Sequence, residues 1–315
     1  MSLCAAGSLA AAGVELDLEA LYLQRGGSRS KTLIYQGVEP TGTKKITGRK
    51  LVRRCGYEPA FRVTLGGSGE TLGGYVRALA LGGWESHKKT KGYPLGLPFA
   101  NTTYAPEWQN GYMADDKYKN NLTLIDAYIS KTVAPLWKDY FGLKYMVGLQ
   151  YFNIPASNTL NLYSQLLTRF GAPYSVKNTY TAKSHNDALL GAIGFYFQMR
   201  PVKTFALELI GYGGIGGNYA TSKTKLKGVN NTLIRRSSNQ DAIGMAYSFL
   251  SSVRLTYKPY EFFEISGSYE YILANGMAFA YRQMSYGVLP TSDNHVHREG
   301  TASYQGFALR IGFRL

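Results

Sequence analysis

Apolar and polar residues alternate along ten separate stretches of this chain. In the last stretch, Leu309, Ile311 and Phe313 alternate with Arg310 and Gly312. A period of two places each set on one face of a β-strand. The pattern therefore predicts ten strands, with no segment of helical length and 3.6-residue period between them. The stretches cover residues 14–22, 61–65, 75–81, 125–130, 141–151, 193–198, 205–209, 252–257, 263–271 and 307–315.

The connections between the predicted strands alternate in length, so every long connection falls at the same end of the sheet. The long ones are 25–56, 83–120, 153–183, 217–241 and 274–300, and the short ones are 66–71, 133–140, 200–203 and 258–261. Outer-membrane barrels have short periplasmic turns and long extracellular loops, whereas a soluble sandwich or lipocalin-like barrel has no reason to sort its loops. We therefore predict an all-β fold: a single transmembrane up-and-down antiparallel β-barrel of ten strands, or twelve if the first long connection contains a hairpin.

The two ends of the predicted barrel are expected to pair with each other. The final stretch runs to the last residue, and an unpaired apolar edge strand there would promote aggregation. Pairing of 307–315 with 14–23 would close the barrel and remove that edge. The ending, with Phe313 followed by terminal Leu315, is also typical of the signal read by the bacterial barrel-insertion machinery, which we expect as a partner.

Composition agrees with a barrel in a Gram-negative outer membrane. The chain has 36 Gly and 26 Tyr among 315 residues and is 45% hydrophobic, which indicates many turns and strands and excludes a disordered chain. No run approaches the roughly 18 apolar residues of a membrane helix. The apolar sets are expected to face lipid, with Leu207 in the middle of the membrane. Aromatic girdles at the two interfaces are expected to include Tyr22, Tyr145, Tyr151, Tyr257, Phe263 and Phe313.

Residues 1–13 are small, mostly apolar and without charged side chains, and Ala10-Ala11-Ala12 fits a signal-peptidase cleavage pattern. We interpret 1–13 as the residual part of a signal peptide and 14–315 as the outer-membrane barrel. A flexible Ala/Gly tail and a lipidated Cys4 are the alternatives. Cys4 and Cys55 are too few for a disulfide framework or a Cys-based zinc site.

Ten charged residues alternate with the lipid-facing sets and are expected to point into the lumen. These candidate lumen charges are Arg62, Arg77, Asp126, Lys144, Glu208, Arg254, Glu264, Glu270, Arg310 and Arg314. Six are basic and four acidic, so an open path between them would prefer anions. The leading interpretation is a porin for small solutes or ions. The alternative is a structural or surface-binding barrel whose paired charges fill the lumen, because ten strands lie near the closed end of the size range.

The net charge of +15 is concentrated in two of the long connections. Residues 25–56 carry nine basic residues against Glu39, and residues 217–241 carry five against Asp241. At the cell surface such segments are expected to contact outer-membrane lipid and lipopolysaccharide phosphates. Nucleic acid is not expected as a partner, because the aromatic residues lie in the strands rather than among the basic residues.

Several motifs in the middle of the chain resemble known families. In order they are Gly142-Leu143-Lys144-Tyr145, Gly148-Leu149-Gln150-Tyr151-Phe152-Asn153, Asn186-Asp187-Ala188-Leu189-Leu190-Gly191 and Gly213-Gly214-Ile215-Gly216-Gly217-Asn218. The order resembles the β-barrel porin family of planctomycetes and the Legionella-type pore-forming outer-membrane protein family, over about residues 118–220 and the C-terminal strand. The resemblance implies a pore-forming barrel and supplies no catalytic residues. This chain departs from the family where Ile154-Pro155-Ala156 replaces the acidic residues expected there.

A glycine motif fits a nucleotide site only in its spacing. Gly211, Gly213 and Gly216 match the dinucleotide-binding pattern, but the polar residues after them lack the helical periodicity that such a site requires. Glycine at the end of a strand is the simpler interpretation, and no cofactor is expected.

The Asp293-Asn294-His295-Val296-His297 segment contains an Asp-x-His pair similar to that of the omptin proteases. An omptin-like site needs a second acidic pair, and Asp115-Asp116 has the wrong spacing for it. We therefore expect no enzyme, and we interpret the two histidines as loop residues rather than as a metal site.

Overall fold

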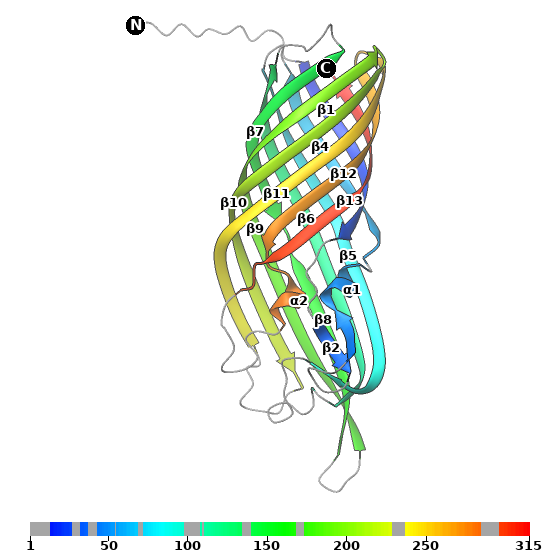
Figure 1. Cartoon of the computed structure of the whole chain (residues 1–315), viewed down its shortest axis with the longest axis vertical. Helices are drawn as coiled ribbons and strands as arrows, with labels where there is room; N and C mark the ends of the chain where they lie inside the picture. The colour runs from blue at the N-terminus through cyan, green and yellow to red at the C-terminus, as the bar shows by residue number, and fades with distance from the viewer. Residues whose placement is uncertain are drawn as a thin grey trace, which may run out of the picture.

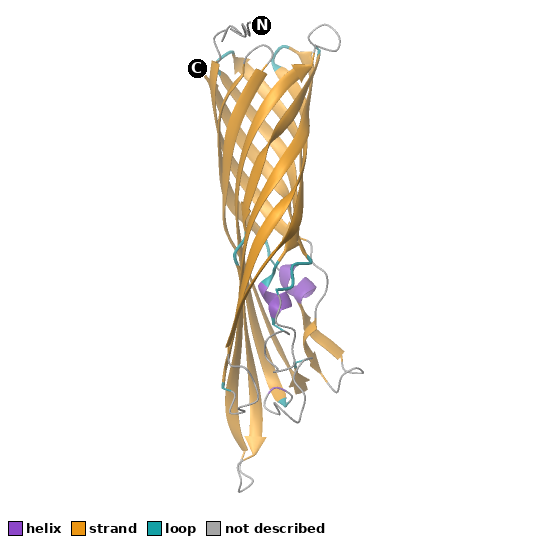
Figure 2. Cartoon of the chain, turned by 90° about the vertical axis from the view of Figure 1, so that its left-hand side faces the viewer, coloured by secondary structure: helices purple, strands orange, loops and turns teal. Residues whose placement is uncertain are grey.

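The computed structural model describes residues 13–26, 32–36, 43–53, 55–68, 72–97, 108, 110–133, 140–167, 173–228, 237–284 and 296–315. The predicted signal segment 1–13, apart from Gly13, lies outside the described residues, as does Cys4. Within them, almost the whole chain is strand (Figures 1 and 2). The strands are β1 (Gly13–Gly26), β2 (Thr32–Gln36), β3 (Thr43–Thr47), β4 (Tyr57–Ser68), β5 (Leu72–Gly96), β6 (Gly111–Val133), β7 (Phe141–Asn153), β8 (Ala156–Leu167), β9 (Pro173–Val202), β10 (Phe205–Lys227), β11 (Ser237–Tyr260), β12 (Phe263–Met277) and β13 (Gly300–Arg314), and the helices are α1 (Gly48–Val52) and α2 (Ala280–Gln283).

The strands close into an antiparallel ring with ten positions, as the alternation predicted. The ring runs β1, β4, β5, β6, β7, β9, β10, β11, β12 and β13, and β13 pairs with β1 from Glu15↔Arg314 to Gly26↔Ser303. The tenfold count holds because β7 and β8 occupy one position in succession, each between β6 and β9. The first long connection does contain a hairpin, β2–β3, but it pairs only with the far end of β5 and does not widen the ring.

Three of the predicted long loops are largely strand. Strand β9 has 30 residues and β5 has 25, whereas a membrane-spanning strand needs about 9–11. We call the strand segments beyond the membrane the outer extension; it comprises 83–96, 111–121, 156–167, 173–187, 219–227 and 237–241. The loop prediction was wrong here because outside lipid the outward positions are lysine, serine and threonine, so the apolar alternation ends while the strands continue.

A belt of apolar side chains surrounds the ring. Ile193 is 70% exposed, Ile129 69% and Val147 63%, so the predicted sets face outward. Tyr22 stacks on Tyr57 at one edge of this belt. Leu207, however, is only the third residue of β10 and lies near the short-turn end, not in the middle of the belt. No helix in the described part of the chain is long and apolar enough to span a membrane.

Candidate functional site

Ion pairs between β1, β4, β10, β11 and β12 link neighbouring parts of the barrel wall inside the lumen. Arg62 of β4 donates from Nε to Glu19 Oε2 at 3.1 Å and from Nη1 to Glu270 Oε2 at 2.7 Å. Arg254 lies 3.4 Å from the same Glu19 and 3.8 Å from Glu208. All five side chains are buried, so each charge has its counter-charge inside the barrel.

A second set of ion pairs lies closer to the short turns. Arg310 contacts Asp17 at 2.8 Å and also pairs with Glu264. Arg314 reaches Glu264 at 3.2 Å and Glu15 at 3.8 Å. These contacts link β1, β12 and β13, the strands at which the ring closes.

Arg77 and three tyrosines form a layer across the middle of the lumen. Arg77 binds Asp126 on the neighbouring strand at 2.8 Å, and its guanidinium lies 5.4 Å from the centre of the Tyr212 ring. Tyr75 and Tyr212 share a hydroxyl–hydroxyl hydrogen bond of 2.5 Å, and the Tyr128 and Tyr212 rings are 4.7 Å apart. Because these side chains come from β5, β6 and β10, the layer spans the interior rather than lining one wall.

The structure places all ten predicted lumen charges on inward positions, but the predicted excess of basic charge does not hold. Four further inward charges line a lumen cavity shared with seven of the predicted residues but were missing from that set: Glu15, Asp17, Glu19 and Arg200. Together with the ten predicted residues, these described side chains make a set of seven basic and seven acidic groups. The alternation of β1 already indicated its three acidic residues, since they occupy the face opposite Val14, Leu16 and Leu18. A balanced lumen removes the charge argument for anion preference.

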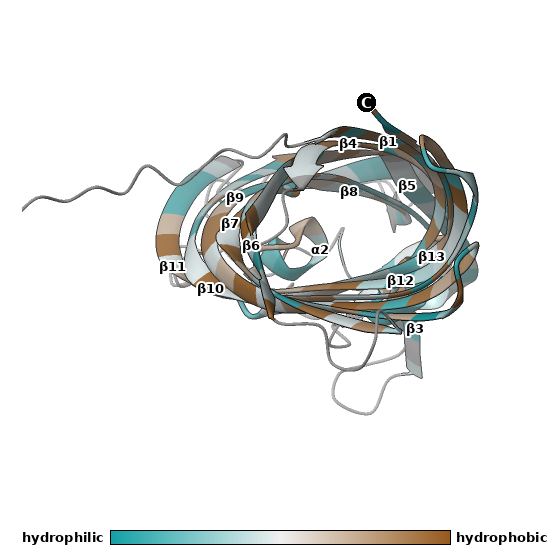
Figure 3. Ribbon diagram, turned by 90° about the horizontal axis from the view of Figure 1, so that it is seen from above, coloured by the Kyte–Doolittle hydropathy of each residue, from teal (hydrophilic) through white to brown (hydrophobic). Residues whose placement is uncertain are grey.

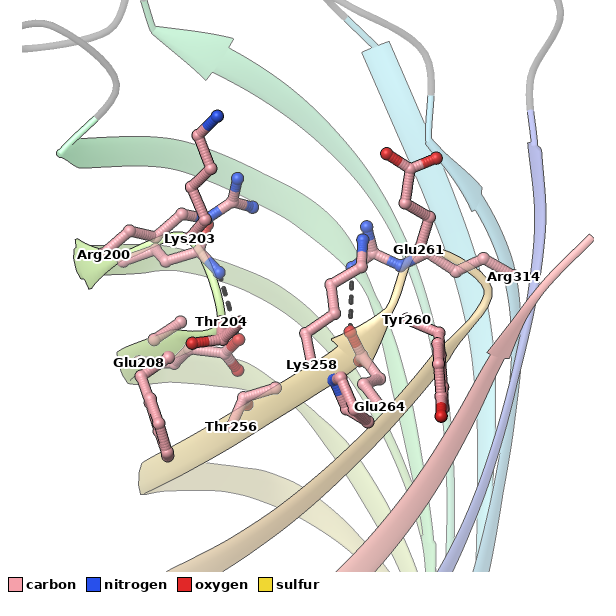
Figure 4. A pocket seen from close by; sticks show the side chains of 14 residues that line it. Arg200, Lys203, Thr204, Glu208, Thr256, Lys258, Tyr260, Glu261, Glu264 and Arg314 are labelled. Carbon is pink, nitrogen blue, oxygen red and sulfur yellow. Dashed lines mark hydrogen bonds and ion pairs between the residues drawn. The ribbon is translucent and has the colours of Figure 1, made fainter.

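The half of the lumen near the short turns is hollow. A cavity of about 710 Å³ extends from the rim to the tyrosine layer, and Lys144, Glu208 and Arg254 line it. The Lys144 ammonium lies 5.7 Å from the Tyr196 ring centre, over its face. A smaller cavity of about 250 Å³ lies at the rim, where Figure 4 shows Arg200 and Arg314 among its lining residues.

Large side chains close the opposite half of the lumen. Trp84 is completely buried, donates to the Leu23 carbonyl at 3.1 Å and packs on Tyr304 with 4.8 Å between ring centres. The buried Arg25 guanidinium lies 4.8 Å from the Phe279 ring centre and 5.3 Å from that of Tyr118. We call Trp84, Tyr118, Phe279, Tyr281 and Tyr304, with Arg25 between them, the outer plug. Figure 3, a view down the barrel, shows α2 within the outline of the ring.

Two asparagines hold α2 in this position. Asn186 accepts from the Ala278 amide at 2.6 Å and donates to the Ala278 carbonyl at 2.8 Å. Asn218 donates to Asn186 at 3.1 Å and to the carbonyl of Gly276 at 2.9 Å. Gly276 has φ +81°, which favours glycine, and any Cβ there would lie 2.3 Å from the Met245 carbonyl. Both asparagines belong to the motifs that carry the family resemblance, and the structure brings them together.

The acidic pair considered for a protease does not form a joint site. Asp115 and Asp116 are consecutive in β6, so they face opposite sides of the sheet. Asp115 contacts His87 on the outer face, while Asp116 is buried beside Asn158 under α2. Burial raises the pKa of the Asp116 carboxyl to about 8.

The histidine motif and the glycine motif also supply no site. Asp293, Asn294 and His295 lie outside the described residues. Gly211, Gly213 and Gly216 lie within strand β10, not before a helix. No cluster of three metal-ligating side chains occurs among the residues that the structure describes.

Comparison with solved structures identifies the fold. The chain is similar to the outer membrane protease OmpT from Escherichia coli, with 11% identity over 96% of each chain and a TM-score of 0.53. It also matches the attachment invasion locus protein Ail of Yersinia pestis (11% identity, 96% of this chain and 99% of that chain, TM-score 0.25) and a Pseudomonas aeruginosa FadL homologue (8% identity, 96% and 90%, TM-score 0.28). The last two scores are too low to indicate the same arrangement of strands.

No protein-family model and no curated protein matches the chain. The planctomycete and Legionella-type families therefore remain a resemblance in sequence motifs. The closed antiparallel ring and the likeness to OmpT both indicate an outer-membrane barrel. The exposed apolar belt around the ring requires a surrounding membrane. The chain has the fold of the bacterial outer-membrane β-barrels.

Proposed function

We propose that the chain is a closed outer-membrane barrel that holds its outer extension at the cell surface as a binding platform. The observation that carries this proposal is the outer plug. Trp84, Tyr118 and Tyr304 come from three different strands and are completely buried inside the ring, and Phe279 before α2 and Tyr281 in α2 add two more buried rings. A barrel of about this size is narrow enough for large side chains to fill its interior. The rings of the outer plug therefore close this half of the lumen to solutes.

The paired charges support the same function. In a porin, lumen charges face water and act on passing ions. Here Arg62, Arg77 and Arg310 are each bound to carboxylates within the barrel. Such charges are already neutralised, so they contribute to the shape of the interior more than to the attraction of a solute.

Porin-like passage is the second candidate, and the inner cavity favours it. About 710 Å³ of the short-turn half is open, so only the tyrosine layer and the outer plug separate it from the outside. Passage would require α2 to leave the lumen. Under this second candidate, the chain would be a member of the planctomycete or Legionella-type pore-forming families. The hydrogen bond between Asn218 and Asn186, which both lie in the motifs shared with those families, supports this membership.

We also propose that the barrel is not an enzyme. Asp115 and Asp116 face opposite sides of β6, which gives no pair of carboxylates that could hold one water molecule.

Conductance in planar bilayers tests the proposal. The full chain should give no stable current steps, whereas a Tyr75→Ala/Tyr212→Ala/Phe279→Ala/Tyr281→Ala variant, in which both the tyrosine layer and the outer plug are thinned, should give measurable current. Ile243→Ala/Met245→Ala, which removes two exposed side chains of β11, is the matched control and should stay silent. Steady ohmic steps from the unaltered chain would overturn the closed barrel in favour of the porin.

A further inference from the structure

A row of lysines crosses the outer face of the outer extension. The strand registers place Lys119 opposite Ser157, Ser157 opposite Lys183, and Lys183 opposite Lys223. All four residues therefore lie side by side on β6, β8, β9 and β10. We call Lys119, Lys183 and Lys223 the lysine row. Like charges directly opposite each other destabilise a sheet, so the Lys183–Lys223 pair costs stability unless an anion lies between them.

The lysine row lies at a groove rather than on a flat sheet. A cavity of about 540 Å³ opens there, next to Pro155 in the short segment that separates β7 from β8. Its lining includes the hydroxyl residues Ser157 and Thr221 and the imidazole of His185. Ammonium and hydroxyl groups that converge on one hollow are the donors that a phosphate group uses.

The groove lies at the height of lipid headgroups. In β9 and β10, the last outward row at the edge of the belt is Asp187 beside Tyr219, and the lysine row is four residues farther along. At about 3.3 Å per residue this is roughly 13 Å along a strand, and about 9 Å along the membrane normal for a strand tilted by 45°. Tyr219 is 44% exposed and marks the interface, as aromatic residues do in membrane barrels.

The acidic groups near the groove leave two of the lysines free. Glu85 pairs with Lys119 at 2.8 Å, and Asp187 is held by Tyr151 at 2.5 Å and by Asn153 at 2.8 Å. His185 also contacts Asp187, at 3.0 Å. Asp241 of β11 is paired with Thr221 of the neighbouring strand β10. Among the described residues, no carboxylate lies within ion-pair distance of Lys183 or Lys223.

We propose that this groove binds the phosphate groups of an outer-leaflet lipid. The inference rests on the proposed function, because it requires the outer extension to lie on the cell-surface side of the membrane. Lys183 and Lys223 contact the phosphate, Lys119 flanks them, and Ser157 and Thr221 donate hydrogen bonds. A membrane-anchored ligand arrives from the belt side, where the groove meets the lipid.

The test uses the full chain in detergent and native mass spectrometry. The probes are lipid A with phosphates at both ends of its disaccharide, the same lipid without phosphates, and inorganic pyrophosphate. Lys183→Gln/Lys223→Gln is compared with Lys89→Gln/Lys91→Gln, which removes two charges from the same face of β5 away from the groove. We expect tightest binding of the phosphorylated lipid, and about tenfold weaker binding only in the first variant.

Three outcomes would overturn the proposal. Equal loss in both variants would show attraction by net charge alone, and equal binding of both lipids would show that phosphate is not recognised. Pyrophosphate bound as tightly as phosphorylated lipid A would overturn the lipid as occupant. The lipid-binding experiment measures no current. The lipid-site proposal can therefore be wrong while the closed-barrel proposal is right, and the reverse.

Discussion

Arg77 and Asp126 occupy paired positions on neighbouring strands, and their side chains meet inside the barrel. The Arg77 Nε lies 2.9 and 3.0 Å from the two Asp126 oxygens, and its Nη2 lies 2.8 Å from one of them. Tyr212 covers the guanidinium from across the lumen. The pair therefore ties the wall to the layer that separates the hollow half of the barrel from the plugged half.

Breaking this pair should destabilise the barrel strongly. Asp126→Asn leaves the buried Arg77 without its counter-charge, which should lower the free energy of unfolding by about 3–5 kcal/mol. Urea unfolding in lipid vesicles measures the loss. Arg77→Met/Asp126→Leu removes both charges and should recover most of it. Glu85→Gln, at an exposed ion pair, should change stability by less than about 1 kcal/mol. A neutral Asp126→Asn would mean that water solvates Arg77 and that the layer is open.

The depth of a lipid-facing position should determine the cost of placing a charge there. Ile193 lies in the middle of the belt on β9, so Ile193→Arg should cost about 2–4 kcal/mol. Leu207 lies near the short-turn edge, so Leu207→Arg should cost about 0–1 kcal/mol. Both values come from the same vesicle unfolding experiment. Equal costs at the two positions would contradict the assignment of the belt.

The packing of α2 should depend on pH through Asp116. Its pKa is about 8 in the folded protein and near 3.8 in an unfolded chain, so the folded state holds a proton that the unfolded state has lost. The stability contributed by this group is full below pH 4 and falls as the pH rises to about 8. Asn158, which lies beside Asp116, donates to the Met284 sulfur at 2.8 Å, so the loss should reach α2.

Hydrogen exchange of residues 280–284 measures this dependence. Exchange at these amides, corrected for intrinsic rates, should become faster between pH 4 and pH 8 in the unaltered chain and level off above pH 8. Asp116→Asn keeps a neutral side chain and should remove the dependence, whereas Asp115→Asn on the outer face should retain it. A pH profile that is the same in all three proteins would exclude Asp116 as the responsible group.

The asparagine pair should hold the plug in place. Asn186→Ala leaves the amide and carbonyl of Ala278 without their partner, at a cost of about 1–3 kcal/mol for local opening. This corresponds to roughly five- to 150-fold faster hydrogen exchange around α2. Asn161→Ala removes one hydrogen bond, to Thr179 on the outer face, and should leave that exchange unchanged. No acceleration in Asn186→Ala would mean that packing alone retains the plug.

The membrane part of the fold could be predicted from the sequence because lipid imposes a simple rule. Every outward residue there is apolar or small, so Ile125, Val147 and Ile193 show the period of two directly. Beyond the membrane the rule ends. Thr221, Lys223 and Lys225 face outward in β10 while Ser222 and Thr224 face inward, so polar residues on both faces concealed the strand.

The candidate site was predictable only in part. The inward charges follow from alternation, and the same reasoning applied to β1 yields Glu15, Asp17 and Glu19. The outer plug had no such signal. Segment 278–284 is fixed by Asn186, which is 92 residues from Ala278 in the chain, and no local pattern encodes a contact at that separation.

Single-channel recording from the unaltered full chain in a planar bilayer tests the central claim most directly. Insertion is verified beforehand by resistance of the membrane-spanning strands to added protease. A closed barrel predicts no resolved current steps in either salt orientation, because the tyrosine layer and the outer plug block the path through the lumen. Reproducible ohmic steps from the inserted protein would contradict the account and identify an open pore.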